Sequence, residues 1–276
     1  MTVTFLGHSG FFLELPEADI LFDYYQGDLP SPDPEKPLFV FASHAHGDHF
    51  TRRIFSLAQK TEKILYILSD DIPKNKVPGD LMTAGKVRFT GPDKDFRVMV
   101  PQAGPGGSGE PAGNTGTSVR VRTFLSTDAG VAFLLDVPDV PSGNGKSGTA
   151  GVFTGARIYH AGDLNDWHWD DVDQEWNDEQ YRGYQDALKK IAACVSEDGH
   201  VPDAAFVPVD TRLGDGEFFW MGLDEYMKAV GARSIFPMHL FGDPAVIDRM
   251  RELPCAEAYR DRILGSGTPG EKFRSV

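Results

Sequence analysis

Three histidines and one aspartate lie within six residues of one another, directly after an apolar segment. The run Leu38–Ala42 is followed, after one serine, by the motif His44-x-His46-x-Asp48-His49. Imidazole and carboxylate groups are good ligands for zinc and related divalent ions. While the backbone stays extended, His44 and His46 project to the same side, because side chains alternate with a period of two. The glycine turn that follows lets Asp48 and His49 reach the same space. The pattern therefore predicts a metal site at the end of a strand.

Short strands and a few helices must position this motif. Segments rich in Val, Ile, Phe and Tyr, bounded by Gly, Pro, Asp or Asn, predict strands at 3–6, 11–15, 20–23, 38–42, 63–68, 87–90, 96–100, 119–125, 131–137 and 158–160. Their spacing of about ten residues predicts antiparallel meanders. Apolar residues at helical intervals predict helices over 175–197, 223–230 and 246–253, and a shorter helix over 52–60.

The histidine motif resembles the signature of the metallo-β-lactamase superfamily. Four further segments are similar to later landmarks of that superfamily and occur in the same order: Gly7-His8-Ser9-Gly10, Ile20-Leu21-Phe22-Asp23, Tyr159-His160-Ala161-Gly162-Asp163 and Phe236-Pro237-Met238-His239. The resemblance covers about residues 2–242. It is greatest to the branch of metal-dependent hydrolases that includes the ascorbate-6-phosphate lactonase-like proteins.

This resemblance implies an α/β (α+β) fold, a four-layer αββα sandwich with a metal site at one edge, lined by loops from both halves. We expect a single domain over residues 1–276. Two segments rich in Gly, Pro and Ser, at 101–117 and 141–151, are too poor in apolar side chains to fold alone and are predicted to be loops. Strand-type sequence resumes after each, so neither is expected to divide domains.

The resemblance also implies a ligand set for two metal ions. His44 and His46 would bind a first ion; Asp48, His49 and His239 would bind a second. Asp163 would bridge the two ions, and Asp48 and Asp163 would also position the nucleophile. All of these groups offer only nitrogen or oxygen atoms, as a divalent ion of this kind requires.

The sequence departs from the superfamily pattern at one ligand. The superfamily normally supplies a further histidine to the first metal, some tens of residues after the motif. Between His49 and His160 this chain has no histidine. Asp128, between two predicted strands, could replace it as an oxygen ligand, or His168 could fold back over the site. The third alternative is a weakened first site, with one tightly held metal rather than two.

Other residues are expected around the metals. His8 is predicted to contact the substrate or a metal ligand, the alternative being an ordinary buried turn histidine. Asp23 ends a strand and could orient a ligand histidine by accepting its second N–H. Arg212 is a candidate anchor for an anionic group of the substrate, or else part of an exposed ion pair. Trp167, Trp169 and Trp176, interspersed with aspartates, predict either a lid over the pocket or a solvated loop.

Composition excludes several classes of function. The chain has 27 Lys and Arg against 41 Asp and Glu, a net charge of −14, and no basic run longer than two residues, which argues against nucleic acid as a partner. A hydrophobic fraction of 41% argues against a disordered chain. No apolar stretch approaches the ~20 residues that span a bilayer, so no membrane mode is expected. Only two cysteines and no signal-like start favour a reducing, cytoplasmic location. The sequence gives no prediction of oligomeric state.

These observations favour a metal-dependent hydrolase that uses an activated water on a small-molecule substrate: a lactone, ester, amide or phosphoester. Zinc is the expected cofactor, as one or two ions, although such sites also accept manganese, iron or nickel. The alternative is a non-catalytic metal-binding or regulatory protein in which the first-metal site has eroded. Redox chemistry with iron is a third interpretation, which the lack of an evident flavin or electron-transfer module disfavours.

Overall fold

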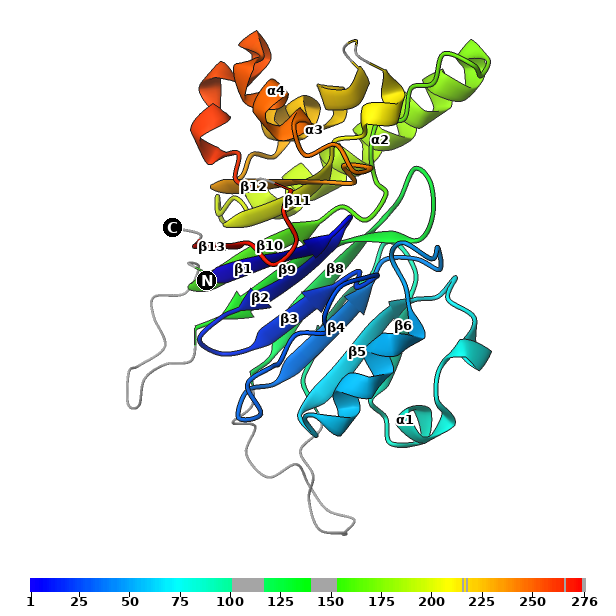
Figure 1. Ribbon diagram of the computed structural model, residues 1–276, viewed down its shortest axis with the longest axis vertical. Helices are drawn as coiled ribbons and strands as arrows, with labels where there is room; N and C mark the ends of the chain where they lie inside the picture. Colours follow the sequence, from blue (N-terminus) through cyan, green and yellow to red (C-terminus); the bar gives the residue numbers. More distant parts are fainter. Residues whose placement is uncertain (101–116, 140–152, 215, 217, 266, 275–276) are drawn as a thin grey trace.

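In the computed structural model, two β-sheets pack face to face and helices cover their outer faces (Figure 1). The structure describes residues 1–100, 117–139, 153–214, 216, 218–265 and 267–274. The two predicted Gly-rich loops lie outside the described residues, apart from Thr117. The four layers confirm the αββα sandwich that the resemblance implied.

The first sheet has seven strands in the order β13-β1-β2-β3-β4-β5-β6. Their bounds are Thr2–Gly7 (β1), Gly10–Glu14 (β2), Asp19–Phe22 (β3), Leu38–Ala42 (β4), Ile64–Ser69 (β5), Val87–Thr90 (β6) and Lys272–Arg274 (β13). Its outer face is covered by η1 (Arg52–Gln59), η2 (Lys74–Lys76) and α1 (Gly79–Thr83). Leu57 of η1 and Leu81 of α1 pack with Val40 of β4 in one buried cluster.

The second sheet has six strands in the order β12-β11-β10-β9-β8-β7. Their bounds are Asp95–Val98 (β7), Val119–Leu125 (β8), Val131–Pro138 (β9), Gly155–His160 (β10), Ala204–Pro208 (β11) and Ser234–Met238 (β12). The helices on its outer side are α2 (Gln174–Ser196), α3 (Phe218–Ala229) and α4 (Val246–Glu252), with the short turns η3 (Thr211–Leu213), η4 (Pro254–Ala258) and η5 (Arg260–Arg262).

The expectation of antiparallel meanders is right for part of each sheet and wrong for the rest. Strands β1 to β3 and β7 to β10 do pair antiparallel in chain order. Strands β3 to β6 and β10 to β12 are parallel. Parallel neighbours need a crossover, and the segments between these strands carry η1, α1, α2 and α3. The regular spacing of apolar runs did not reveal those crossovers.

Aromatic side chains fill the space between the two sheets. Phe22 and Phe41 of the first sheet lie 5.2 Å apart between ring centroids, and Phe41 meets Phe133 of the second sheet at 5.1 Å. Phe11 and Phe206 make a further contact between the sheets at 4.3 Å. This packed interior holds the strand ends at one edge in fixed positions. Among the described residues, the helices include none with the length and apolar character to cross a bilayer.

Candidate metal centre

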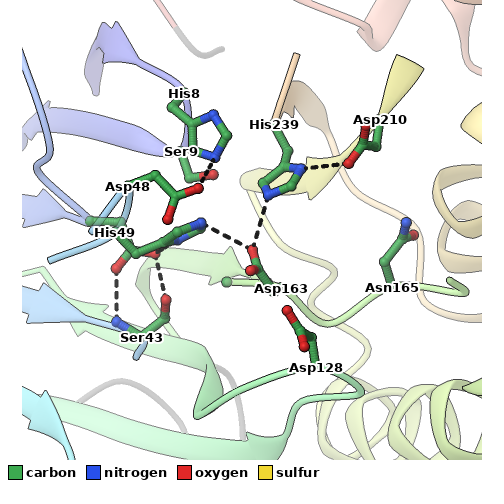
Figure 2. A network of polar contacts seen from close by, with 12 residues as sticks. His8, Ser9, Ser43, Asp48, His49, Asp128, Asp163, Asn165, Asp210 and His239 are labelled. Atoms are coloured by element: carbon green, nitrogen blue, oxygen red, sulfur yellow. Dashed lines mark hydrogen bonds and ion pairs between the residues drawn. The ribbon is translucent and has the colours of Figure 1, made fainter. Parts of the chain in front are cut away.

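The predicted ligands converge where several strands end at the same edge of the sandwich. The histidine motif follows β4, Asp163 follows β10, and His239 directly follows β12. His8 comes from the turn between β1 and β2. Figure 2 shows His8, Asp48, His49, Asp163 and His239 pointing toward a common space. Residues more than two hundred positions apart in the sequence thus meet at one site.

Backbone strain is concentrated at this edge. Within the part of the chain that the structure describes, five non-glycine residues have a positive φ: His8 (52°), Asp23 (40°), Asp93 (54°), His239 (65°) and Phe241 (44°). All but Asp93 lie in or beside the candidate centre. Such conformations cost free energy and persist where the surrounding structure imposes them, which often occurs at functional sites.

One group of possible ligands consists of His44, His46 and Asp163, whose ligand atoms all lie within 4.8 Å of one another. His44 Nε2 is 3.2 Å from Asp163 Oδ2. Two atoms that each bind a zinc ion at about 2.05 Å with tetrahedral geometry are separated by about 3.3 Å. The spacing of His44 and Asp163 is therefore that of two ligands sharing one ion. His46 is exposed and lies on the cavity side of this group.

A second group consists of His8, Asp48, His49 and His239, again with ligand atoms within 4.8 Å. His49 Nε2 and His239 Nε2 lie 3.1 and 3.5 Å from Asp163 Oδ1, and His8 Nε2 lies 3.2 Å from Asp48 Oδ2. Asp163 thus directs Oδ2 toward the first group and Oδ1 toward the second. A carboxylate in this position has the geometry of a bridge between two ions.

The unsatisfied atoms of the centre fit a divalent cation. His8 Nε2, His44 Nε2, His49 Nε2 and Asp163 Oδ1 are buried and form no well-aligned hydrogen bond; their close polar contacts, at 3.1 to 3.5 Å, are with other residues of the same centre. Buried polar atoms are almost always paired, so four such atoms in one place call for a missing partner. Each can present a lone pair, and imidazole nitrogen with carboxylate oxygen is a donor set suited to zinc and similar ions.

Carboxylates behind the histidines fix which ring nitrogen faces the site. Asp23 Oδ2 lies 2.7 Å from His49 Nδ1, and Asp210 Oδ2 lies 3.0 Å from His239 Nδ1. Asp23 is fully buried and also accepts bonds from the backbone N–H and the hydroxyl of Ser43, at 2.8 and 2.6 Å. With Nδ1 hydrogen-bonded in this way, each Nε2 is left free to bind an ion.

A glycine allows the β8–β9 turn to pack directly beneath the motif. Gly130 has a φ of +63°, and a Cβ at this position would collide with the Ser43 carbonyl. The next residue, Val131, donates its N–H to that same carbonyl at 3.0 Å. The start of β9 is thereby joined to the segment that carries His44, and the two sheets hold the motif between them.

The charges of the centre perturb its titration in the metal-free protein. Burial lowers the pKa of the His49 ring, but the close carboxylates of Asp163 and Asp23 outweigh burial and raise it to about 10. Burial raises the pKa of Asp163, but bonds from His44 and His49 bring it well below the usual range. A proton therefore stays on His49 unless a cation replaces it, so metal binding would release that proton.

The two candidates for the missing ligand occupy different places. Asp128 lines the same cavity as Asp163, and Figure 2 shows its carboxylate on the Asp163 side, although it belongs to neither ligand group. His168 stacks against Phe218 of α3, with ring centroids 3.8 Å apart, and also lies outside both groups. Among the described residues the first group therefore retains three members. Arg212, the expected anion anchor, does line the cavity.

Asp210 was not predicted from the sequence, and His8 was predicted only as a contact of the substrate or of a metal ligand. Asp210 follows β11 just as Asp23 follows β3, and each carboxylate contacts one histidine of the centre. The available signal was an aspartate directly after an apolar strand. Its partner depends on the pairing of β11 with β12, which the sequence does not display. His8 was expected near a ligand, and its Nε2 lies within the second group itself.

A cavity of about 320 Å³ opens onto the centre. One side carries His46, Asp48, Asp163 and His239. The other residues that line it are Thr127, Asp128, Trp167, Trp169, Trp176, Gln180, Arg212 and Phe241. Its volume is at the lower end of the range for sites that hold small molecules.

Comparison with known sequences points to a family of metal-dependent proteins. Residues 2–97 match the family model described as a beta-lactamase superfamily domain. A UPF0173 metal-dependent hydrolase from Desulforamulus reducens is 31% identical over 169 residues, which are 59% of this chain and 62% of that protein. A protein of the same description from Opitutus terrae is 49% identical over 53 residues, 23% of its length. The chain thus matches less than two thirds of the length of either relative.

Solved structures share the arrangement of the whole chain. Igni18, a metallo hydrolase from Ignicoccus hospitalis, has a TM-score of 0.55 at 16% identity, covering 99% of this chain and 98% of that one. A possible metal-dependent hydrolase from Veillonella parvula has a TM-score of 0.52 at 12% identity, covering 100% and 99%. At such identities the likeness shows a common fold.

Proposed function

We propose that this chain is a member of the metallo-β-lactamase superfamily and a hydrolase that depends on a divalent metal and acts on a small molecule. The observation that carries the proposal is the pair of ligand groups on either side of Asp163, with their unpaired buried atoms. In this proposal His44 and His46 hold one ion, and Asp48, His49 and His239 hold another. His8 stands beside Asp48 as a further contact of the second ion or of the substrate.

The metal ions, for which zinc is our expectation, would lower the pKa of a water molecule to about 7 and polarise the substrate oxygen. The chain's own residues orient the reaction. Asp163 lies between the two groups and fixes their separation. Asp48 is 38% exposed toward the cavity and can accept a hydrogen bond from the attacking water, while His8 holds the carboxylate in place at 3.2 Å. Asp23 and Asp210 keep the ligand histidines in one tautomer.

The substrate would be a lactone, ester, amide or phosphoester of modest size, in keeping with the cavity of about 320 Å³. Arg212 is the proposed contact for an anionic group of the substrate. Its guanidinium is held by Asp210 at 2.6 to 3.1 Å and lies 3.6 Å from the ring centroid of Phe241, so it is fixed in the cavity wall. The finer resemblance to ascorbate-6-phosphate lactonase-like proteins stays a prediction.

A second candidate function is a metal-binding or regulatory protein without catalysis. One observation favours it: the first ligand group has three members, of which His46 is exposed. Such a site would hold its ion weakly, and a single tightly held ion would remain with Asp48, His49, Asp163 and His239. The two functions therefore differ in the number of metal ions per chain and in turnover.

Elemental analysis of the purified protein separates these possibilities. We expect close to two divalent ions per chain after reloading, and hydrolysis of a generic phosphodiester or lactone that is lost on chelation and restored by metal. One ion per chain without turnover would favour the binding protein. No retained metal would contradict both proposals.

The variant Asp163→Asn tests the bridging role directly. Because the neutral amide cannot share two oxygens between two ions, we expect turnover to fall at least about a hundredfold and the metal count to drop. The control is Asp19→Asn, an equally buried aspartate at the start of β3 that touches none of the centre. Full activity in Asp163→Asn, with normal activity in the control, would refute the assignment.

A further inference from the structure

The wall of the cavity that faces the metal ligands is aromatic. Trp167, Trp169, Trp176 and Phe241 line it, so three of the four tryptophans of the chain surround one small cavity. The fourth, Trp220, lies on α3 and does not line this cavity. Large flat side chains gathered beside ligand groups indicate a surface for a ring.

This wall is rigidly attached to the metal centre. The indole N–H of Trp167 donates to the backbone carbonyl of Asp163 at 2.9 Å, and its ring is only 4% exposed. Two hydrogen bonds join the backbone of Trp169 to the side chain of Asn177 on α2. The Asn177 amide accepts from the Trp169 N–H and donates to the Trp169 carbonyl, both at 3.0 Å. Trp176 is the residue before Asn177. The Trp167 ring and the backbone of Trp169 are therefore held in place before any ligand arrives, which lowers the entropic cost of binding.

Packing explains only part of this arrangement. Trp167 is buried and belongs to the core, whereas Trp169 and Trp176 are only partly buried and turn surface toward the cavity. Phe241 is 42% exposed and adopts a φ of +44°, a conformation that is unusual for an aromatic residue. Its ring packs against Arg212 and against the rings of His8 and His239, so this strained residue belongs to the site rather than to the core.

Four polar residues stand beside the four aromatic ones, and two of them, Thr127 and Arg212, already bond within the protein. Thr127 is already engaged with the backbone of Asn165, at 2.6 and 3.1 Å. Gln180, Asp128 and Arg212 are the other polar residues on this side of the cavity. A sugar ring needs hydrogen-bond partners around its whole edge, whereas an aromatic ring needs mainly flat apolar contact. The lining therefore favours an aromatic ring.

From this we infer that the substrate carries an aromatic ring next to its hydrolysable group, and that the ring stacks on Trp169 and Trp176. The inference rests on the proposed function, because it takes the metal centre to receive the reacting group. It deepens that proposal by naming the substrate class: an aryl ester, aryl phosphoester or aromatic lactone or amide.

Binding of phosphonates tests the inference without turnover. Calorimetry of the metal-loaded protein compares phenylphosphonate, cyclohexylphosphonate and methylphosphonate, which present the same anion with different groups. We expect phenylphosphonate to bind about tenfold more tightly than methylphosphonate, because ring burial and stacking are added. It should also bind about threefold more tightly than cyclohexylphosphonate, which has similar bulk but no π face.

Two substitutions locate the ring. Trp169→Leu and Trp176→Leu keep an apolar side chain and leave the backbone bonds to Asn177 intact, so the loop should keep its fold. Each should weaken phenylphosphonate binding about fivefold and leave methylphosphonate binding unchanged. Trp220→Leu is the matched control on α3 and should change neither affinity.

The outcomes separate this inference from the proposed function. If methylphosphonate binds in a metal-dependent way but phenylphosphonate has no advantage, the ring site is refuted and the metal centre stands. If phenylphosphonate binds equally well with and without metal, the ring site stands and the metal-centred function fails. Binding of neither ligand contradicts both, and unchanged phenylphosphonate affinity in both tryptophan variants overturns the inference.

Discussion

Strand β10 has a buried ionisable residue near each end. The two residues differ in how completely their polar atoms are hydrogen-bonded. Near its start, Arg157 is 1% exposed and lies in a network of ion pairs. Just beyond its other end, Asp163 is 4% exposed and lies among histidines. Both side chains are almost fully buried, and each can carry a charge. The difference lies in which atoms have partners.

Every nitrogen of the Arg157 guanidinium has an acceptor. Nε donates to Asp136 at 2.6 Å, Nη1 to Asp198 at 2.9 Å and to the His200 carbonyl at 2.6 Å, and Nη2 to Asp198 at 2.9 Å. Arg122 alongside is less complete, because its Nε and Nη1 have no hydrogen-bond partner. Those unpaired atoms are donors, however, and a donor N–H cannot bind a cation.

The unpaired atoms at the Asp163 end are of the opposite kind. They are histidine nitrogens and a carboxylate oxygen, which can offer lone pairs to a metal once the proton on His49 is displaced. The comparison teaches that burial of charge alone does not identify a functional site. A converging set of unpaired acceptor atoms does indicate a cation site, while paired ions at the other end of the same strand indicate a structural role.

Among these predictions, the largest effect on the free energy of unfolding is expected from removing the ion pairs of Arg157. Arg157→Met leaves Asp198 and one oxygen of Asp136 without their partner, and removal of one side of a buried ion pair costs about 3 to 5 kcal/mol. Urea denaturation measures the loss. The matched control is Lys189→Met, which removes an exposed pair with Asp186 and should cost less than about 1 kcal/mol.

The Arg157→Met variant also tests whether metal binding at the Asp163 end is independent of the ion pairs of Arg157. Metal content per folded chain should be unchanged in Arg157→Met, because none of its partners belongs to either ligand group. A variant that keeps full stability but loses metal would show that the two ends are coupled, and the distinction between them would be wrong.

A smaller effect, confined to the other end, is expected from Asp23→Asn. The amide can still contact Ser43, but it no longer provides a charged acceptor for His49 Nδ1, which now bonds at 2.7 Å. Loss of such a contact typically weakens metal binding about 10- to 100-fold. Competition with a chromogenic chelator measures the affinity. Asp19→Asn, on the same strand β3, is the control, and an equal loss in both variants would contradict a specific orienting role.

The elements of the fold that depend on local sequence were predictable, and their pairing was only partly so. Ranges such as 38–42 and 119–125 are the strands β4 and β8, because a buried strand has a continuous or alternating apolar pattern. The parallel pairing of β3 to β6 was not predicted, since the pattern of one strand contains no information about the direction of its neighbour.

The candidate centre shows the same limit. The motif from His44 to His49 is contiguous, so its chemistry could be recognised from spacing alone. Asp163 and His239 were expected only through resemblance to a family, because each is distant in sequence. Asp210 became visible only when the structure placed the ends of β11 and β12 side by side, with Val209 donating its N–H to the Met238 carbonyl at 2.9 Å. The roles of these residues as metal ligands stay predictions.

A third group of acids, Asp166, Asp224 and Glu225, gathers around α3. Lys228 pairs with Asp224, and His168 acts on Asp166, but no ion pair is formed by the half-buried Glu225 among the described residues. Burial, reinforced by the charges of Asp166 and Asp224, raises the pKa of Glu225 to about 7. In the unfolded chain a glutamate titrates near 4.3. Between these values the folded protein holds the additional proton, so its stability should fall as the pH rises from about 4.5 to 7, and the full penalty should remain above pH 7.

Glu225→Gln should remove that fall, and it is the smallest effect of the series. The substituted amide can keep the contact with Gln185, which now lies at 2.8 Å. At pH 8 we expect the variant to be more stable than the wild type by roughly 1 kcal/mol, allowing for partial exposure, whereas at pH 4.5 the two should agree. Urea denaturation of metal-free protein keeps metal binding out of the comparison, and Glu252→Gln at the exposed end of α4 is the control. If Glu225→Gln and the control follow the same pH curve, Glu225 is ionised in the folded protein at neutral pH, and this group of acids does not differ from an ordinary surface cluster.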